Sequence, residues 1–296
     1  MDQNFTTEQV FSRTECLIGK GALSFLQKQK VAVFGVGGVG GYVAEGLARA
    51  GIGGLALVDR DVVDVSNLNR QIVALASTVG KGKVDVMKAR IAEISPRTEV
   101  VAYHEFFLPE NADFIDFSAY DYVVDCVDTV TAKILIVQRA KQAKKPCITA
   151  MGAGNRLQPL QIQVADIAKT DGCPLAKVMR RELRKRGVFS GVKAAFAPVG
   201  DKERMLLENL AEINERDSVA EMQDGASAPV AAQGSSPKIV EGEADKEIKK
   251  PGREKIAPGS ISFLPALMGM TIAGTVVDDL LKIYVQKNKE NCGTNK

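Results

Sequence analysis

Tryptophan is absent from this chain of 296 residues, only 5% of the residues are aromatic, and there is a single histidine, His104. Proteins that hold exposed nucleic-acid bases by stacking need aromatic side chains, so stacking platforms for such bases should be scarce here. The lone histidine follows the apolar run Val-Val-Ala-Tyr, and we assign it no catalytic role. The formal net charge of +3 is too small to identify a partner.

Cysteine pairs are missing as well. The five cysteines are scattered and none forms a C-x-x-C pair, which argues against a disulfide framework and a tetrathiolate zinc site. This usage fits a reducing compartment. Because residues 1–7 lack the basic and apolar segments of a secretory signal, we expect a cytoplasmic location, with an organelle left open. Cys173 is the nearest candidate for a reactive thiol, and an incidental small residue is the favoured interpretation.

Long apolar runs are scarce. Residues 261–277 form the most apolar late stretch, but this stretch contains Pro265 and leads into Asp278 and Asp279. A membrane span needs about 20 consecutive apolar residues. We therefore predict a helix packed in the protein core and no membrane partner.

An alternation of strands and helices fills the first half of the chain. An apolar strand at 30–35, a helix at 38–51 and a second strand at 55–59 form a β-α-β unit. Residues 160–165 alternate and predict an antiparallel strand. We expect an α/β fold: a Rossmann-like, mostly parallel twisted sheet with helices on both faces, extended by antiparallel strands. The further predicted elements are helices at 83–94 and 131–143 and strands at 99–103, 122–126 and 147–150.

Composition divides the chain into three parts. Residues 1–200 carry the alternating pattern and form the predicted ligand-binding domain. Residues 201–258 begin with a predicted helix at 202–214 and are then rich in Ala, Gly, Ser, Pro, Glu and Lys, which indicates a mobile, low-complexity polar insertion. Residues 259–296 predict an apolar helix that packs on the first domain and a polar tail.

Four glycines, Gly35, Gly37, Gly38 and Gly40, form a G-x-G-x-x-G motif directly after the first strand and at the start of a helix. Glycines permit a tight turn and the close approach of a phosphate, which the N–H groups of the helix N-terminus then hold. Asp59 closes the second strand, where a carboxylate can accept hydrogen bonds from a ribose. The pattern predicts a nucleotide site, and both NAD and ATP fit it at this point.

A polar loop follows Asp59, at the edge of the sheet where ligands bind. Arg70 presents a planar fork to phosphate oxygens, and Lys83 presents a compact charge. Asp128 ends another strand and is suited to hold Mg²⁺ beside phosphates. This set favours ATP, because a dinucleotide oxidoreductase leaves Arg70, Lys83 and Asp128 unexplained. The other predicted nucleotide-binding residues of the loop are Asp61, Ser66, Asn67, Asn69 and Gln71.

The stretch from Arg13 to Asp128 resembles the ThiF, MoeB and ubiquitin-activating-enzyme superfamily through the residues just named. The resemblance implies ATP and Mg²⁺, and an enzyme that adenylates a carboxylate with release of pyrophosphate. It implies that Asp59 binds ribose, that Arg70 and Lys83 neutralise phosphates, and that Asp128 positions Mg²⁺. It further implies that Arg13 is an arginine finger that reaches across a homodimer.

Within this superfamily the chain is most similar to the tRNA threonylcarbamoyladenosine dehydratase branch. Three motifs carry this resemblance: Arg13-x-x-x-Leu17-x-Gly19, Gly152-Ala153-Gly154 and Gly259-Ser-Ile-Ser-Phe263-x-Pro265. That branch implies ATP-dependent cyclisation of the threonylcarbamoyl group on a tRNA, with net loss of water. Residues 192–199 depart from it, because they lack the Ser-x-Glu segment of relatives. The alternative is an adenylating activator of a ubiquitin-like or sulfur-carrier protein, with such a protein or a sulfur relay as partner. A non-catalytic nucleotide-binding scaffold also stays open.

A tRNA substrate predicts a basic surface. The densest basic stretch is 177–186, with a smaller one at Lys141, Lys144 and Lys145. The competing interpretation of 177–186 is a solvated helix with Val178 and Leu183 on the core. Phosphate binding is the interpretation we favour.

Overall fold

The computed structural model describes residues 6–158, 161–223 and 259–293. Contacts divide the chain into two units, residues 1–199 with 260–296 and residues 200–259. The first is an α/β unit, and the second contains the helix α7 (Asp201–Gln223).

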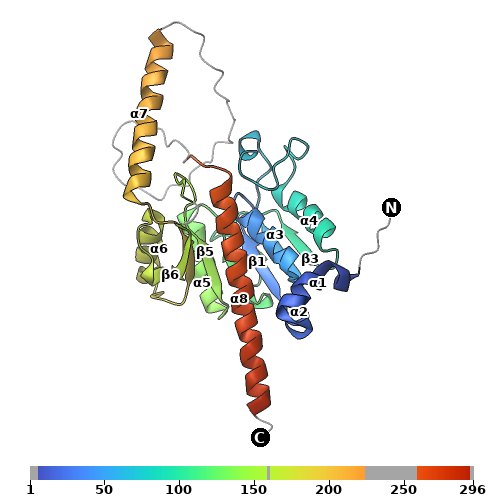
Figure 1. Cartoon of the computed structure of the whole chain (residues 1–296). Helices are drawn as coiled ribbons and strands as arrows, with labels where there is room; N and C mark the ends of the chain where they lie inside the picture. The colour runs from blue at the N-terminus through green and yellow to red at the C-terminus, as the bar shows by residue number, and fades with distance from the viewer. Residues whose placement is uncertain (1–5, 159–160, 224–258, 294–296) are drawn as a thin grey trace. The chain divides into compact units, whose positions relative to one another are not determined.

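A seven-stranded sheet in the order β3-β2-β1-β4-β5-β7-β6 forms the centre of the α/β unit (Figure 1). Neighbouring strands are parallel except β6, which is antiparallel to β7. The predicted α/β fold, with its mostly parallel sheet and antiparallel extension, is confirmed. The strands are β1 (Lys30–Phe34), β2 (Gly54–Val58), β3 (Glu99–Tyr103), β4 (Tyr122–Asp125), β5 (Cys147–Ala150), β6 (Gln163–Asp166) and β7 (Lys193–Phe196).

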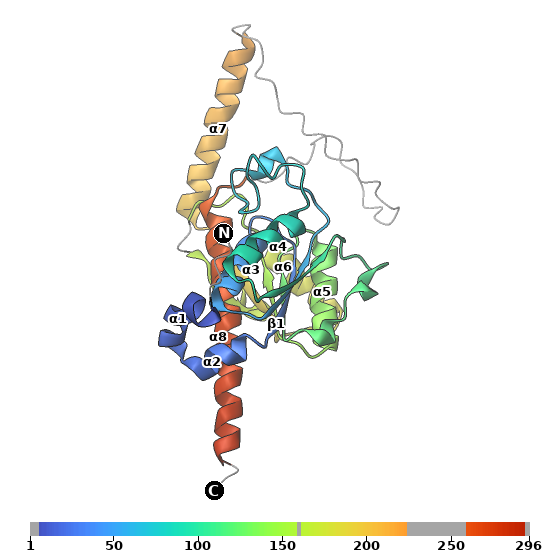
Figure 2. The same ribbon diagram turned by 90° about the vertical axis from the view of Figure 1, so that its right-hand side faces the viewer.

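Helices cover both faces of the sheet, because alternate residues of each buried strand point to opposite faces. Val31 and Val33 pack with α3, α4 and α8, whereas Ala32 and Phe34 pack on the other face with α5 and α6. Figure 2 shows α8 and α5 on opposite sides of β1. The helices of this unit are α1 (Thr7–Ile18), α2 (Lys20–Leu26), α3 (Gly40–Ala50), α4 (Lys83–Ile94), α5 (Val130–Gln142), α6 (Pro174–Lys185) and α8 (Phe263–Gly293).

Helix α8 is long and apolar enough to cross a membrane, by length and composition, over residues 263–290. It packs on the sheet instead, and 44% of its most apolar window is buried. The hydroxyl of Tyr122 in β4 donates to Oδ2 of Asp279 at 2.8 Å, which anchors the helix. α8 is thus a core helix, as the sequence predicts. A row of its buried side chains recurs at every fourth position: Leu264, Met268, Ile272, Val276 and Leu280.

Glycines allow α8 to cross α3 at short range. A Cβ at Gly269 would lie 2.5 Å from the carbonyl oxygen of Val39 and 2.7 Å from Cβ of Tyr42. A Cβ at Gly46, on α3, would lie 2.8 Å from Cβ of Ala273. The two helices therefore have no room for larger side chains at these positions.

We expect Gly269→Leu to force α8 away from α3 and to lower the free energy of unfolding by about 1–3 kcal/mol, the usual cost of overpacking. Denaturant unfolding measures this loss. Gly274→Ala is the matched control, because nothing lies within 4 Å of a Cβ at that position. It should stabilise the helix by about 0.5–1 kcal/mol, since alanine is the better helix former. Equal losses at both positions would contradict the close-contact explanation.

Some elements differ from the sequence prediction. The sequence does not predict α1, α2 or β7; the β7 run Lys-Ala-Ala-Phe has no β-branched residue, and its pairing between β5 and β6 makes it a strand. The predicted strand at 160–165 is β6, which ends at Asp166. The helix predicted to end at residue 214 continues to Gln223, so residues 218–223, predicted to be mobile, are helical. The rest of the predicted mobile insertion, 224–258, lies outside the described residues.

Candidate active site

The predicted site lies where the strand order of the sheet reverses. β1 pairs with β2 on one side and with β4 on the other, and ligands of open α/β sheets bind at the carboxyl ends of the strands at this point. The N–H of Gly35 donates to the carbonyl of Val58 at 2.8 Å, and the N–H of Cys126 donates to that of Phe34 at 2.7 Å. These bonds bring the loops after β1, β2 and β4 together.

The glycine loop is too tight for side chains at two of its positions. Gly35 has φ of +85°, and a Cβ there would lie 2.7 Å from the carbonyl oxygen of Cys126. A Cβ at Gly40 would lie 1.8 Å from the carbonyl oxygen of Gly35. At Gly37 only Nε2 of Gln71 comes near, at 3.7 Å. The loop therefore packs tightly against the sheet at Gly35 and Gly40, whereas its backbone is open at Gly37. A phosphate needs such an open stretch of backbone to reach the N–H groups.

Asp59 joins the glycine loop to the polar loop. Its Oδ2 accepts from the N–H of Val36 at 2.7 Å and its Oδ1 from the N–H of Asp61 at 2.8 Å. Burial raises the pKa of Asp59, and the nearby charge of Lys83 and the two N–H donors offset this only in part. Each carboxylate oxygen has a second lone pair, so the group can still accept from ribose hydroxyls.

Lys83 is held at the site by Asp61. Its Nζ lies 2.7 Å from Oδ2 of Asp61, and the Lys83 side chain is only 7% exposed. The backbone N–H of Lys83 also donates to the carbonyl of Asp61 at 3.0 Å. The structure thus brings together two predicted residues that lie 22 positions apart.

The polar loop holds its phosphate-binding side chains through its own backbone. The short 3₁₀ helix η1 (Val65–Asn67) is capped by Asp64. Nη1 of Arg70 donates to the carbonyl of Ser66 at 2.8 Å and to Oδ1 of Asn69 at 2.9 Å. The loop is fixed to the segment before α8, because Nδ2 of Asn69 donates to the carbonyl of Ser260 at 3.1 Å.

Gln71 carries a buried acceptor that the protein leaves unsatisfied. The residue is 8% exposed, and within the described ranges its Oε1 has no hydrogen-bond partner. A buried polar atom without a partner costs about 1–3 kcal/mol. Because this side chain faces Gly37, a nucleotide that donates a hydrogen bond would satisfy it, and the residues present fit such a ligand.

Asp128 is exposed in the turn between β4 and α5. No group of three His, Cys, Asp or Glu residues that could hold a metal occurs in the described part of the chain. A magnesium ion at Asp128 would therefore take its other ligands from phosphates and water, which is usual at nucleotide sites.

The structure does not bring Arg13 to the glycine loop of its own chain. Arg13 is exposed on α1, and α1 packs at the C-terminal end of α3, where a Cβ at Gly51 would lie 3.4 Å from the ring of Phe11. The glycine loop lies at the opposite end of α3. At about 1.5 Å per residue, the helix separates the two by roughly 16 Å.

A buried ion pair beneath the turn of Asp128 is missed by the sequence prediction. Nζ of Lys133 lies 3.1 Å from Oδ2 of Asp125, and both side chains are fully buried. Lys133 also donates to the carbonyl of Val127 at 2.9 Å, and Thr149 donates to the same carboxylate. The available signal was a lysine inside the apolar part of a helix, where a lone charge requires a partner.

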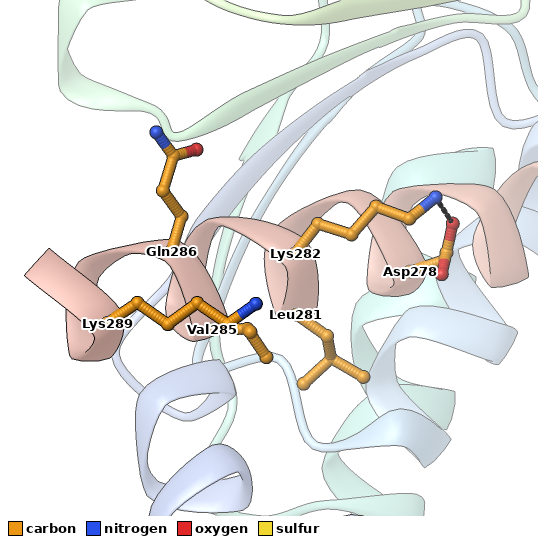
Figure 3. Close-up of a pocket in the computed structure, with 6 residues that line it drawn as sticks. All are labelled: Asp278, Leu281, Lys282, Val285, Gln286 and Lys289. Atoms are coloured by element: carbon orange, nitrogen blue, oxygen red, sulfur yellow. Dashed lines mark hydrogen bonds and ion pairs between the residues drawn. The ribbon is translucent and has the colours of Figure 1, made fainter.

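A pocket in the structure lies elsewhere, along the C-terminal half of α8 (Figure 3). Asp278 and Lys282 at its rim form an ion pair of 2.6 Å. This half of α8 lies near the amino ends of the strands, since the neighbouring Asp279 bonds Tyr122 at the start of β4. None of the predicted site residues lines this pocket, and we assign it no role in catalysis. Its lining residues are Asp278, Leu281, Lys282, Val285, Gln286 and Lys289.

A mostly parallel sheet whose switch point carries a glycine loop, a partly buried aspartate directly after β2 and two fixed cations defines a nucleotide-binding α/β protein. The chain belongs to the ThiF family, whose model matches residues 11–296. It is 40% identical over 286 residues to a tRNA threonylcarbamoyladenosine dehydratase of Bacillus subtilis, covering 95% of this chain and 98% of the relative.

Other proteins that are similar to this chain carry the same name as the Bacillus subtilis relative. A dehydratase of the same name from Escherichia coli is 40% identical over 192 residues, covering 65% of this chain and 71% of the relative. The crystal structure of the Escherichia coli enzyme in complex with ATP has a TM-score of 0.70 to this chain at 28% identity, covering 94% and 96% of the two chains. The same enzyme has been solved with AMP, also with a TM-score of 0.70.

Proposed function

We propose that this protein is an ATP-dependent tRNA threonylcarbamoyladenosine dehydratase. The observation that carries the proposal is the end-to-end match to a bacterial dehydratase, at 40% identity over 95% of the chain. The site supports it, because its residues suit ATP. The proposal places the protein in the cytoplasm, in keeping with its dispersed cysteines.

ATP binds with its phosphates on the glycine loop and its ribose at Asp59. The free backbone at Gly37 and the positive end of the α3 dipole suit the phosphates. Arg70 and Lys83 neutralise them, and the unsatisfied Oε1 of Gln71 accepts a hydrogen bond from the nucleotide. Gly38, Ser66, Asn67 and Asn69 complete the surroundings of the nucleotide.

The reaction joins two anions, the carboxylate of the modified nucleoside and the α-phosphate. The carboxylate oxygen attacks the α-phosphorus and pyrophosphate leaves; attack on the acyl carbon from within the same modification then releases AMP and closes the ring, with net loss of water. The barrier is largely electrostatic, so Arg70 and Lys83 stabilise the charge that develops on the phosphate. Asp128 would hold Mg²⁺, which would supply further neutralisation of the phosphates.

A homodimer completes the site, with Arg13 of one copy serving the other. The distance between Arg13 and its own glycine loop supports this arrangement. Exposed apolar side chains such as Val65 at 63% and Leu267 at 45% exposure would be covered in a dimer. An isologous dimer buries the same surface from each copy.

The alternative, an activator of a carrier protein, is weaker. Thioester chemistry needs an accessible thiol in an electropositive site, whereas Cys173 is only 6% exposed and belongs to the apolar cluster between the sheet and α6. Carrier-dependent ATP–pyrophosphate exchange, with no change in tRNA, would favour this alternative.

The test is to incubate the purified protein with ATP, Mg²⁺ and tRNA that carries threonylcarbamoyladenosine, and to digest the tRNA for mass spectrometry of its nucleosides. We expect this nucleoside to lose the mass of one water, with AMP and pyrophosphate formed in equal amounts. An ATP analogue whose bond between the α- and β-phosphates cannot be cleaved is the control and should give no conversion. An unchanged nucleoside in the presence of ATP would refute the proposal.

A further inference from the structure

The outer face of α6 is strongly basic. Glu182 is the only carboxylate on this helix, and it lies 3.1 Å from Arg181, 3.0 Å from Lys185 and 3.1 Å from Arg186. These three cations lower the pKa of Glu182 to about 2, so it stays ionised but neutralises only part of their charge. The exposed cations of this face are Lys177, Arg181, Arg184, Lys185 and Arg186.

One residue of the basic stretch does not belong to this surface. Arg180 turns toward the body of the protein, where its Nη1 donates to the carbonyl of Thr170 at 2.7 Å and to its Oγ1 at 2.6 Å. It stabilises the turn before α6 and is half-buried. The prediction that 177–186 binds phosphate therefore excludes Arg180.

The loop after α6 connects this face to the second basic cluster. Nζ of Lys141, near the end of α5, would lie 2.8 Å from a Cβ at Gly191. Lys144 follows on the same end of α5 and is exposed. The two basic stretches, separate in the sequence, thus meet at the loop 187–191.

The same loop presents an exposed aromatic side chain. Phe189 is 64% exposed, although the loop around it is fixed at both ends. The N–H of Val188 donates to the carbonyl of Leu183 at 3.0 Å, and the N–H of Gly191 donates to Oδ2 of Asp166 at 2.6 Å. A fixed, exposed ring among cations suits an unpaired nucleic-acid base beside a stem, because a base outside the double helix can stack on an aromatic face.

This surface begins at the active edge of the sheet and leads away from it. The N-terminal end of α6 lies near the carboxyl end of β7, because the N–H of Val199 donates to the carbonyl of Gly172 at 3.2 Å. The helix then runs toward the opposite edge over about 18 Å. A double-stranded RNA stem that leaves the active edge would meet cations along this length.

We propose that the face formed by α6, the end of α5 and Phe189 binds the phosphate backbone of the tRNA at a distance from the reacting nucleoside. This inference rests on the proposed function. RNA is favoured over an acidic protein because the face has no apolar core: apart from Phe189 and Pro174, at the start of α6, its exposed side chains are polar or charged. Nucleic-acid interfaces are polar and positive, whereas protein interfaces bury apolar residues at their centre.

The test neutralises Lys141, Lys177 and Arg184 to glutamine, three exposed cations for which the structure gives no ion pair. We expect the Kd and KM for tRNA to rise about tenfold, and the slope of log K against log salt to become shallower by about 2–3. The kcat at saturating tRNA and the affinity for ATP should stay within twofold. Phe189→Ala should weaken tRNA binding about tenfold by loss of stacking, and Phe189→Tyr should retain it.

The matched control neutralises Lys20, Lys28 and Lys88, which are exposed on other elements and give the same change of net charge. It should leave tRNA binding within twofold. An unchanged Kd for tRNA and an unchanged salt slope in the first triple variant would overturn the proposal. So would a variant that binds an acidic carrier protein more weakly but binds tRNA as tightly as the wild type. If the wild-type protein neither binds nor converts tRNA, the proposed function itself has failed. The wild type alone gives that result, so it is distinct from a failure of the proposed tRNA-binding face.

Discussion

Arg70→Ala is expected to lower the rate of ATP–pyrophosphate exchange by on the order of 10²–10³-fold, the usual effect of removing one fixed donor from a developing charge. The guanidinium is held by Ser66 and Asn69 through bonds of 2.8 and 2.9 Å from Nη1, and its remaining N–H donors are the groups proposed to bind phosphate. Isotope exchange in the presence of the tRNA substrate measures this rate. The melting temperature should change little, because these bonds lie in an exposed loop.

Arg60→Ala is the matched control, since Arg60 lies in the same loop but stacks over the ring of Phe106 at 5.5 Å. Its exchange rate should stay within about threefold of the wild type, as expected for a surface substitution outside the site. Full exchange activity in Arg70→Ala would remove that residue from the mechanism. Equal losses in both variants would show that the loop acts only as a structural element.

Lys133→Met is expected to lower the free energy of unfolding by about 3–5 kcal/mol, because it leaves the buried carboxylate of Asp125 without its cation. Both side chains are fully buried and lie 3.1 Å apart. The loss of the bond from Lys133 to the carbonyl of Val127 should also release the turn that carries Asp128. Urea unfolding measures the first effect, and the Mg²⁺ concentration needed for half-maximal activity, which should rise, measures the second.

Removing both charges separates the ion pair from simple packing. The double variant Asp125→Asn with Lys133→Met should regain a substantial part of the lost stability, since replacing both partners of a buried pair is often nearly neutral. Lys141→Met, on the exposed end of the same helix, should stay within about 0.5 kcal/mol of the wild type. If Lys133→Met lowers the free energy of unfolding by less than about 1 kcal/mol, the ion pair does not stabilise the fold as proposed.

The glycine loop and the buried ion pair of Lys133 with Asp125 both contact the Cys126–Val127 segment. The Cys126–Val127 segment contacts Gly35 on one side, where a Cβ would lie 2.7 Å from the carbonyl oxygen of Cys126. On the other side it is held by Lys133 and Asp125. The position of Asp128 relative to the glycine loop therefore depends on Lys133 and Asp125, which are buried beneath the turn.

Local patterns explain why much of the site could be predicted. The glycine loop, Asp59 and the polar loop lie at fixed positions relative to consecutive strands, and a β-α-β unit brings the carboxyl ends of its strands together. Lys83 and Asp128 also follow from this rule, because each lies beside the carboxyl edge of the sheet. Their detailed contacts, such as the ion pair of Lys83 with Asp61, do not.

The sequence by itself determined the alternating strands and helices from β1 to β5, the nucleotide loop and the family, because these depend on short-range periodicity and on residue types at fixed spacings. The tertiary structure decided which charges are exposed and which are paired. Arg180 and Arg184 are alike in the sequence, yet one is bonded to Thr170 and the other faces solvent. Lys133 finds Asp125, and Arg13 lies far from its own glycine loop, because packing between distant segments fixes these distances and sequence spacing does not.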